Sequence, residues 1–518
     1  MSRESYDAVP YPARAFFETH PQNLQTVATV YGLTPPPIET ARVLELGCAG
    51  GGNIIPMAYA LPGATFVGID YSPRQIEDAK RVADAVGVNN LALHATSITD
   101  ITPDFGRFDY IIAHGVFSWV PHDVQEAIFR VGRENLSEHG VTYVSFNVFP
   151  GGYTQLWLRE MLMFHAPPGS AASGSERVRH AHEFFDVAMQ SLRAHGHPSA
   201  DVLSRGMIPR DQPEAQILHE LFEDSNEPMY FQDFARRAGE HGLQYLADAG
   251  TNEAPFEQSI PVVKALLDSI DPQDVIRREQ YLDFLRGNQF RRALLVHSDR
   301  VVDRKRLRER VEQLFVLTML QTDAPPDAIA SEQQPVEFVK HRGPGLTVKG
   351  RLNKVVLAAI CDAHPRAVRV GELIDRAAEA LKIPAADLPA QRARAVDVML
   401  GAWLTGVLVF YVTPPPRARL DAGERPEAST YARYQCANRQ RQLINLRHEV
   451  INMPDAMLPL LQLLDGTRTR AQLADAVIAS NFLGPPSQFP NRSAMSDAAR
   501  RTVEEILQNG AKYGLLVG

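Results

Sequence analysis

The stretch VLELGCAGGGNIIPMAYALPGATFVGID, residues 43–70, decides the fold of this chain. An apolar run at residues 43–46 stops at a cluster of small residues and is followed by a helical pattern of apolar side chains. A second apolar run, residues 66–69, ends on Asp70. Glycines let the backbone turn sharply and approach a ligand, and a carboxylate in this place can accept from both ribose hydroxyls. The stretch therefore predicts strand, tight turn, helix and strand around a nucleotide-like ligand.

The same pattern is found in dinucleotide-dependent oxidoreductases and in methyltransferases that use S-adenosylmethionine. The loop lacks the spacing G-x-G-x-x-G, because Ala49 replaces the middle glycine and residues 50–52 are contiguous glycines. Glu45, near the end of the first strand, suits a positively charged ligand better than a pyrophosphate. Both observations favour a methyltransferase.

Composition limits the classes of protein that the chain can represent. With 518 residues the chain is too long for a single core, and a formal charge of −8 argues against a nucleic-acid-binding protein. The 3 cysteines lie far apart, so we expect the protein to be found in a reducing cytoplasm. No His or Cys cluster has metal-ligand spacing, so we expect no metal site. No apolar run reaches the length of a membrane span, and we expect no membrane insertion.

Strand and helix patterns alternate from residue 43 to residue 147, which predicts a mostly parallel sheet covered on both faces. Within this region we expect a helix at 73–86 and strands at 91–94, 108–113 and 141–147. Helical periodicity without strands follows up to about residue 230. Strand patterns return at 242–246 and 292–296, and we expect them to complete the same sheet.

The predicted fold is α/β: a Rossmann-like sheet with a helical insertion, followed by one or two mainly α, winged-helix-like units. A polar segment rich in Pro and Ala, residues 322–335, is the best candidate linker. The expected domains are a ligand-binding domain at 1–154 and 231–300, an insertion at 155–230, a helix and linker at 301–335, a middle or regulatory unit at 336–416, and a C-terminal unit at 417–518.

The sequence resembles class I S-adenosylmethionine-dependent methyltransferases that carry an appended methyltransferase regulatory domain. The segments that carry the resemblance are SYDAVPYPARAFFETHP (5–21), LELGCAGGGNIIPMA (44–58), FVGIDYSPRQI (66–76), FDYIIAHGVFSWVP (108–121), YVSFNVFPGGY (143–153), HGLQYLADA (241–249) and FRRALLVHSD (290–299). Among characterised proteins, the rickettsial-type lysine methyltransferases of outer membrane proteins are similar to it. The resemblance implies S-adenosylmethionine as cofactor and a protein lysine side chain as acceptor.

The resemblance also assigns cofactor contacts. Gly47, Ala49 and Gly51 would line the methionine part, Asp70 would bind the ribose, and Tyr71 would lie near the adenine. The further expected cofactor residues are Glu45, Cys48, Ser97, Ile98, Ala113 and His114. The family often has an Asp for the adenine contact where this chain has Ser97. Cys48 is expected to be a small apolar filler rather than a nucleophile.

Methyl transfer from a sulfonium is an in-line displacement, so the protein mainly has to align the donor and a neutral amine and exclude water. Aromatic rings and carbonyl oxygens can hold the amine. The predicted catalytic residues are His114, Tyr6, Tyr11 and Trp119. Each of these residues also has a purely structural interpretation. Tyr6 and Tyr11 can simply fix the N-terminal arm, and Trp119 can serve packing. His114 can be a hydrogen-bonded core residue.

We therefore predict a cytoplasmic methyltransferase acting on protein lysines. Two alternatives remain open: a small-molecule methyltransferase, and a non-catalytic regulator that senses the cofactor. The apolar stripes of the insertion exceed what so short an excursion can bury on itself, which predicts a homodimer.

Overall fold

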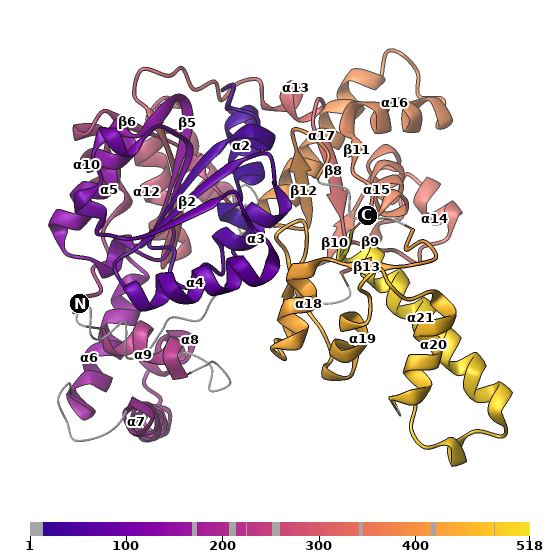
Figure 1. Cartoon of the computed structure of the whole chain (residues 1–518). Helices are drawn as coiled ribbons and strands as arrows, with labels where there is room; N and C mark the ends of the chain where they lie inside the picture. The colour runs from indigo at the N-terminus through magenta and orange to yellow at the C-terminus, as the bar shows by residue number, and fades with distance from the viewer. Residues whose placement is uncertain are drawn as a thin grey trace.

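The computed structural model describes residues 14–167, 174–206, 214–223, 225–250, 260–340, 345–415, 421–480 and 482–517 (Figure 1). Its main sheet has seven strands in the order β3-β2-β1-β4-β5-β7-β6. These strands are β1 (Arg42–Leu46), β2 (Thr65–Asp70), β3 (Leu91–Ala95), β4 (Phe108–Ala113), β5 (Leu136–Asn147), β6 (Leu243–Asp248) and β7 (Phe290–His297). Pairings among the first five are parallel, and β7 runs antiparallel to both β5 and β6. The predicted Rossmann-like sheet, completed after a long insertion, is confirmed.

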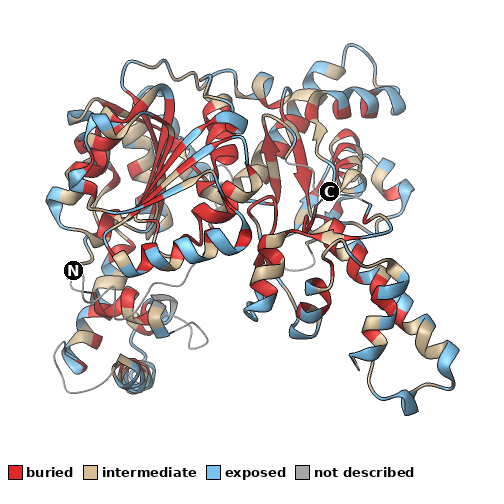
Figure 2. Cartoon of the chain, in the orientation of Figure 1, coloured by how far each residue is buried: buried red, intermediate tan, exposed pale blue. Residues whose placement is uncertain are grey.

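Helices cover both faces of this sheet, and its strands are largely buried (Figure 2). One face packs against α2 (Pro21–Val30), α3 (Ile54–Ala60) and α4 (Pro73–Val86). The other face packs against α5 (His122–Glu134), α10 (Phe231–Glu240) and the start of α12 (Val275–Arg286). Burial on both faces explains why the central strands read as continuous apolar runs rather than as alternating ones.

Local signals set the bounds of α4. The Ser72 hydroxyl accepts from the backbone N–H of Gln75 at 3.2 Å, and Pro73 occupies the first turn, where its missing N–H costs nothing. Gly87 ends the helix with a φ of 75°, a left-handed conformation that favours glycine. The predicted helix at 73–86 is confirmed at both ends.

The insertion forms a small helical layer beside the sheet, and within its described part it contains no strand. Its helices are α6 (Gly152–His165), α7 (Gly174–Ala194), α8 (Ser199–Gly206) and α9 (Glu214–Phe222). They share a hydrophobic core of their own, and in Figure 1 they project from one end of the sheet. A further short helix, α11 (Pro261–Asp268), packs against α12.

The middle unit is built on a three-stranded sheet in which β8 (Phe315–Thr318) lies between β11 (Val368–Arg369) and β12 (Leu408–Tyr411). The helices are α13 (Leu307–Val311), α14 (Pro326–Ala330), α15 (Arg351–Ala363), α16 (Val370–Ala380) and α17 (Leu388–Leu404). A hairpin of β9 (Val336–Phe338) and β10 (Leu346–Val348) precedes α15. Residues 322–335 lie between β8 and β9 and include α14, so both flanks of that segment belong to this unit.

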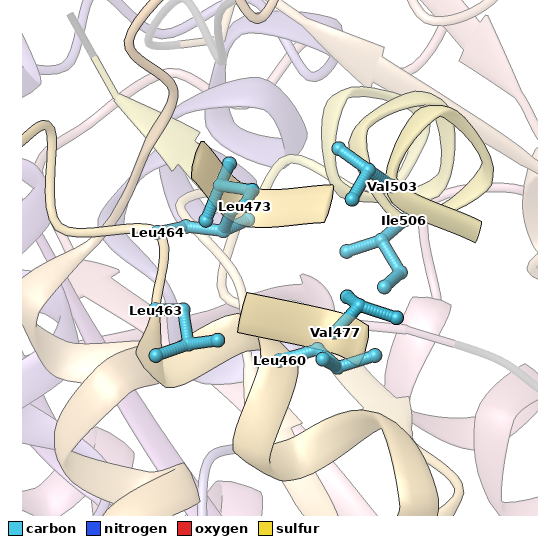
Figure 3. Close-up of a pocket in the computed structure, with 7 residues that line it drawn as sticks. All are labelled: Leu460, Leu463, Leu464, Leu473, Val477, Val503 and Ile506. Atoms are coloured by element: carbon cyan, nitrogen blue, oxygen red, sulfur yellow. The ribbon is translucent and has the colours of Figure 1, made fainter. Parts of the chain in front are cut away.

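The C-terminal unit is mainly helical. Its elements are β13 (Glu427–Ala428), α18 (Thr430–Ala437), β14 (Gln442–Ile444), β15 (Val450–Asn452), α19 (Leu458–Gln462), α20 (Arg470–Ala479), α21 (Arg492–Lys512) and β16 (Leu516–Val517). Leucine, valine and isoleucine side chains of α20, α21 and the segment around α19 converge on a small apolar pocket (Figure 3). Because no polar side chain lines it, this pocket is a packing feature rather than a site for chemistry.

The C-terminal unit packs directly on the sheet domain. Tyr431 of α18 and Ile444 of β14 belong to the same buried cluster as α3 and α4. The backbone N–H of Thr430 donates to the Tyr59 hydroxyl of α3 at 3.0 Å. The sheet domain and the C-terminal unit thus share part of one hydrophobic core.

Candidate active site

The loop after β1 has the backbone geometry of a ligand cradle. Gly47 and Gly51 have φ values of 74° and 77°, and Ala49 also lies in the left-handed region at 47°. A Cβ on Gly47 would lie 2.6 Å from Cγ2 of Val116, so only glycine fits. A Cβ on Gly50 would meet no atom of the described part of the chain within 4 Å, so within that part the outer side of the loop is open.

Asp70 at the end of β2 organises this loop and the start of α4. One carboxylate oxygen accepts from the backbone N–H of Ala49 and the other from that of Ser72, both at 2.9 Å. The side chain is half-buried at the carboxyl end of the sheet, where ligands of open α/β folds bind. Asp70 and the loop are therefore one geometric unit, as their spacing predicts.

Glu45 lies buried beneath the loop, with 3% of its surface exposed. Oε1 accepts from Nδ2 of Asn53 at 2.6 Å, whereas the buried Oε2 has no hydrogen bond to the described residues. Burial raises the pKa of Glu45 to about 7, the negative charge of Asp70 adds to this, and the Asn53 hydrogen bond opposes it. A buried carboxylate oxygen without a partner is suited to a cationic ligand group.

The N-terminal arm links this loop to the end of β4. The backbone N–H of Phe16 donates to Oδ1 of Asn53 at 3.0 Å, and the Phe16 ring lies 3.8 Å from the ring of His114, centroid to centroid. The hydroxyl of Thr19, in η1 (Phe17–Thr19), accepts from Nδ2 of Asn53 at 2.9 Å. Through Phe16, the end of the predicted cofactor loop at Asn53 and His114 belong to one group of contacting residues.

His114 follows β4 and faces the neighbouring strands. Its Nδ1 lies 2.8 Å from the Tyr143 hydroxyl of β5, and its ring meets Phe290 of β7 edge-on. Burial, with a smaller contribution from the positive charge of Arg292, lowers the pKa of His114 to about 3. The imidazole is therefore neutral at physiological pH and is a weak general base.

The other predicted residues differ in how they face this cluster. Tyr71 is 57% exposed beside Asp70. Ser97 caps η3 (Ile98–Asp100) by accepting from the backbone N–H of Thr99 at 3.2 Å, and Ile98 is buried. The backbone N–H of Thr96 donates to the Asp70 carbonyl at 2.9 Å, which brings Ser97 to the predicted adenine side.

Cys48 and Ala113 lie buried in the packed core of the sheet domain. Cys48 is buried over Gly68, where a Cβ would lie 2.9 Å from its Sγ, and burial raises the pKa of its thiol. Ala113 is fully buried in the core beside α5. Trp119, in η5 (Phe117–Trp119), is half-buried. Tyr6 and Tyr11 lie outside the described residues.

Sequence reasoning missed several residues that the fold brings into the site. Asn53 follows the glycine run directly, so its position after the loop was an available signal. The Tyr143 hydroxyl, from β5, contacts His114, and His448 reaches the site from the C-terminal unit. Nothing in the local sequence marks either of these two. Within the described residues no group of three or more His, Cys, Asp or Glu side chains could hold a metal ion.

Models of three protein families match the chain. A "Methyltransferase domain" matches residues 39–149, a "Predicted methyltransferase regulatory domain" matches 213–297, and a "PKMT, C-terminal winged helix domain" matches 424–514. The regulatory-domain match includes β6 and β7 of the main sheet. No helix in the described part of the chain is long and apolar enough to cross a membrane.

Similar proteins are found among curated sequences and solved structures. An uncharacterized protein of Rickettsia prowazekii is 38% identical over 58% of this chain and 54% of its own length, so this match spans about half of that relative. A second from the same organism is 35% identical over 47% of this chain and 96% of its own length. The structure of PKMT2 from Rickettsia typhi in complex with AdoHcy is 26% identical, with a TM-score of 0.83, over 98% of this chain and 100% of that one.

The donor set fits the cofactor of this family. A sulfonium ligand with an ammonium group matches the buried oxygen of Glu45 that has no partner among the described residues, and a ribose matches the half-buried carboxylate of Asp70. The geometry of the glycine loop, the seven-stranded sheet and the matches agree. The chain belongs to the S-adenosylmethionine-dependent methyltransferases that carry a methyltransferase regulatory domain and a PKMT-type winged-helix domain.

Proposed function

We propose that this chain transfers methyl groups from S-adenosylmethionine to lysine side chains of proteins. The observation that carries the proposal is the likeness to PKMT2 of Rickettsia typhi, which extends over 98% of the chain, including the C-terminal unit. The match of that unit to a winged-helix domain described as belonging to PKMT adds support. Methyltransferases with the same sheet act on many classes of acceptor, so the likeness over the whole chain, and not the sheet, supports a protein lysine as the acceptor.

We assign the cofactor to the carboxyl end of β1, β2 and β4. The loop from Gly47 to Gly51 would hold the methionine part, Glu45 its ammonium group, and Asp70 the ribose hydroxyls. Tyr71 and Ser97 border the space on the adenine side. When bound, S-adenosylmethionine supplies an electrophilic methyl group on a sulfonium.

The chain's own side chains orient the acceptor amine and exclude water. Burial keeps His114 neutral, and the Tyr143 hydroxyl fixes its ring. The imidazole can therefore accept a hydrogen bond or pack against an alkyl chain without becoming protonated. The Phe16 ring covers His114 and would shield the amine from solvent. A lysine amine held here beside a sulfonium would lose its proton more readily, because a nearby cation lowers its pKa.

Labelling with isotopic S-adenosylmethionine tests this function. The full chain is incubated with the labelled cofactor and a whole-cell extract, and mass spectrometry identifies the labelled residues. Label on protein lysines is the expected result, and an Asp70→Ala variant is expected to give none. Label on metabolites alone would indicate a small-molecule methyltransferase. Cofactor binding without any transfer would indicate a sensor.

We also propose that the insertion mediates a homodimer. Apolar side chains remain exposed on α6, α7 and α8, among them Trp157 at 42%, Phe164 at 88% and Val187 at 63%. Light scattering at micromolar concentration is expected to give twice the chain mass, and Phe164→Lys with Val187→Lys is expected to give the monomer. Val301→Lys, at an 82% exposed site that directly follows the sheet domain, serves as the control. A monomeric mass of the unmodified chain would overturn this proposal.

We further propose that the protein is cytoplasmic and that its chain divides into the domains that the sequence predicts. The three cysteines, Cys48, Cys361 and Cys436, are all free thiols, which supports a reducing compartment such as the cytoplasm. The main hydrophobic clusters of the sheet domain, the insertion, the middle unit and the C-terminal unit support four of the five expected parts, although Tyr431 and Ile444 of the C-terminal unit also join the cluster of the sheet domain.

A further inference from the structure

A hairpin of the C-terminal unit ends inside the methyltransferase domain. Strands β14 and β15 are joined by residues 445–449, and His448 lies in this turn. His448 is 2% exposed, and its Nε2 lies 2.9 Å from Oδ1 of Asn53, 395 positions earlier in the chain. Its ring also lies 5.2 Å from that of His20, centroid to centroid.

The hydrogen bonds around Asn53 fix the direction of its amide. Oδ1 must be the oxygen, because the backbone N–H of Phe16 donates to it at 3.0 Å. His448 therefore donates through Nε2–H to the same oxygen. The amide nitrogen then points the other way and donates to Oε1 of Glu45 at 2.6 Å and to the Thr19 hydroxyl at 2.9 Å.

The turn that carries His448 is held rigidly. The side-chain oxygen of Asn445 accepts from the backbone N–H groups of Arg447 and Glu449, both at 2.9 Å. The Arg447 guanidinium donates to the Glu449 carboxylate at 3.0 Å. His448 has a φ of 62°, a left-handed conformation that costs free energy for most residues and is found where surrounding contacts impose it. The turn thus presents one imidazole to the sheet domain.

We propose that His448 is a positioning residue of the cofactor site. By donating to Asn53 it fixes the amide that holds Glu45, so the methyltransferase domain reaches its full cofactor affinity only when the C-terminal unit is docked. The proposal rests on the assignment of Glu45 to the cofactor's ammonium group. It gives the C-terminal unit a direct part in cofactor binding, in addition to any role in recognising the acceptor protein.

The test separates positioning from docking through matched variants of the full chain. His448→Asn keeps a residue that tolerates positive φ but places its amide too far from Asn53, whereas His448→Gln can place an N–H where Nε2 lies. Tyr59→Phe is the control, because it removes a hydroxyl that accepts from Thr430 across the same interface without touching Asn53. Calorimetry with AdoHcy gives the dissociation constant, and steady-state assays with S-adenosylmethionine give KM and kcat.

We expect His448→Asn to weaken AdoHcy binding about tenfold and to raise the KM for S-adenosylmethionine more than it lowers kcat, since a lost hydrogen bond to a polar network has this size. His448→Gln should recover most of the affinity, and Tyr59→Phe should match the unmodified chain. Unchanged binding by His448→Asn, or equal loss in Tyr59→Phe, would overturn the proposal.

A double variant distinguishes failure of this inference from failure of the cofactor assignment. If His448 acts through Glu45, the His448→Asn substitution should have little effect on AdoHcy binding in a Glu45→Gln background. An additive loss would mean that His448 acts on folding or docking alone. If Glu45→Gln itself leaves AdoHcy binding unchanged, the assignment of Glu45 is wrong, and the inference falls with it.

Discussion

Replacing Glu45 by glutamine tests the electrostatics of the site most directly. The side chain is buried, one oxygen is bound to Asn53, and the other has no partner among the described residues. Burial raises its pKa from the ordinary value of 4.5 to about 7. The free protein therefore holds Glu45 partly protonated at neutral pH, whereas an ammonium ligand requires the carboxylate.

The expected magnitude follows from this pKa. If only the carboxylate binds the ligand, the association constant falls by a factor of 1 + 10^(pKa − pH), which is about tenfold at pH 6 relative to pH 8. In Glu45→Gln this titration is removed, so the pH dependence between pH 6 and pH 8 should largely vanish. The variant should also bind roughly ten- to a hundredfold more weakly at pH 8, since it loses a hydrogen bond to a charged group.

The stability of the ligand-free protein should depend on pH in the opposite direction to ligand binding. Binding strengthens as the pH rises, whereas the free energy of unfolding should fall. Because the folded pKa of Glu45 lies above the unfolded value, its contribution to stability is present below pH 4.5 and is lost as the pH rises through about 7. The loss amounts to about 3 kcal/mol at 1.36 kcal/mol per pKa unit. Glu45→Gln should not show this loss. Its free energy of unfolding, relative to that of the unmodified chain, should therefore be higher at pH 8 than at pH 5.

Calorimetry with AdoHcy at pH 6, 7 and 8 measures both quantities. At pH 7, binding to the unmodified chain should release about half a proton, which titrations in buffers of different ionisation enthalpy detect. Equal pH profiles for the chain and for Glu45→Gln would refute the reasoning, because another group would then control the titration. Proton uptake on binding would refute it as well.

Three further substitutions test other parts of the site. Gly47→Ala, at a φ of 74° and with its Cβ 2.6 Å from a valine methyl group, should cost about 1–3 kcal/mol in thermal unfolding and abolish tight AdoHcy binding in calorimetry. Gly50→Ala, whose Cβ would meet no described atom within 4 Å, should leave the unfolding temperature unchanged. Tyr143→Phe removes the hydroxyl that fixes His114, so kcat should fall while AdoHcy affinity is kept; an unchanged kcat would contradict the proposed role. Arg291→Met leaves three carboxylates without their buried cation and should destabilise the sheet domain by about 3–5 kcal/mol in thermal unfolding at pH 8, less at pH 5. Equal destabilisation at both pH values would count against an ionic cause.

The sheet domain was the most predictable part because its signals are local. The helix at 73–86 and the strand at 108–113 were predicted with the bounds that the structure gives them. β5 begins earlier than the predicted residue 141, because Leu136 pairs with Phe108 across a register shift. Only the partner strand reveals such a pairing. β8, at residues 315–318, was not predicted, since four residues carry too weak a pattern without the strands beside them.

The candidate site, too, was predictable where its signals are local, and not where it depends on contacts between distant segments. The glycine loop and Asp70 could be recognised because their spacing is set by one local strand-turn-helix-strand unit. Glu45 was singled out for its charge near that loop, but the sequence did not show its burial, nor that one of its oxygens has no hydrogen bond to the described residues. The neutral state of His114 likewise depends on burial by other segments of the chain, with a smaller contribution from the positive charge of Arg292 on another strand.

The sequence by itself determined that a glycine loop and an acidic strand end form a cofactor-binding unit, because short-range backbone conformation requires those residues at that spacing. Only the tertiary structure decided which groups complete the unit. Asn53 meets Phe16 on one side and His448 on the other, and the second contact closes across 395 positions. Such contacts depend on how separately folded units pack, and no local pattern in the chain records them.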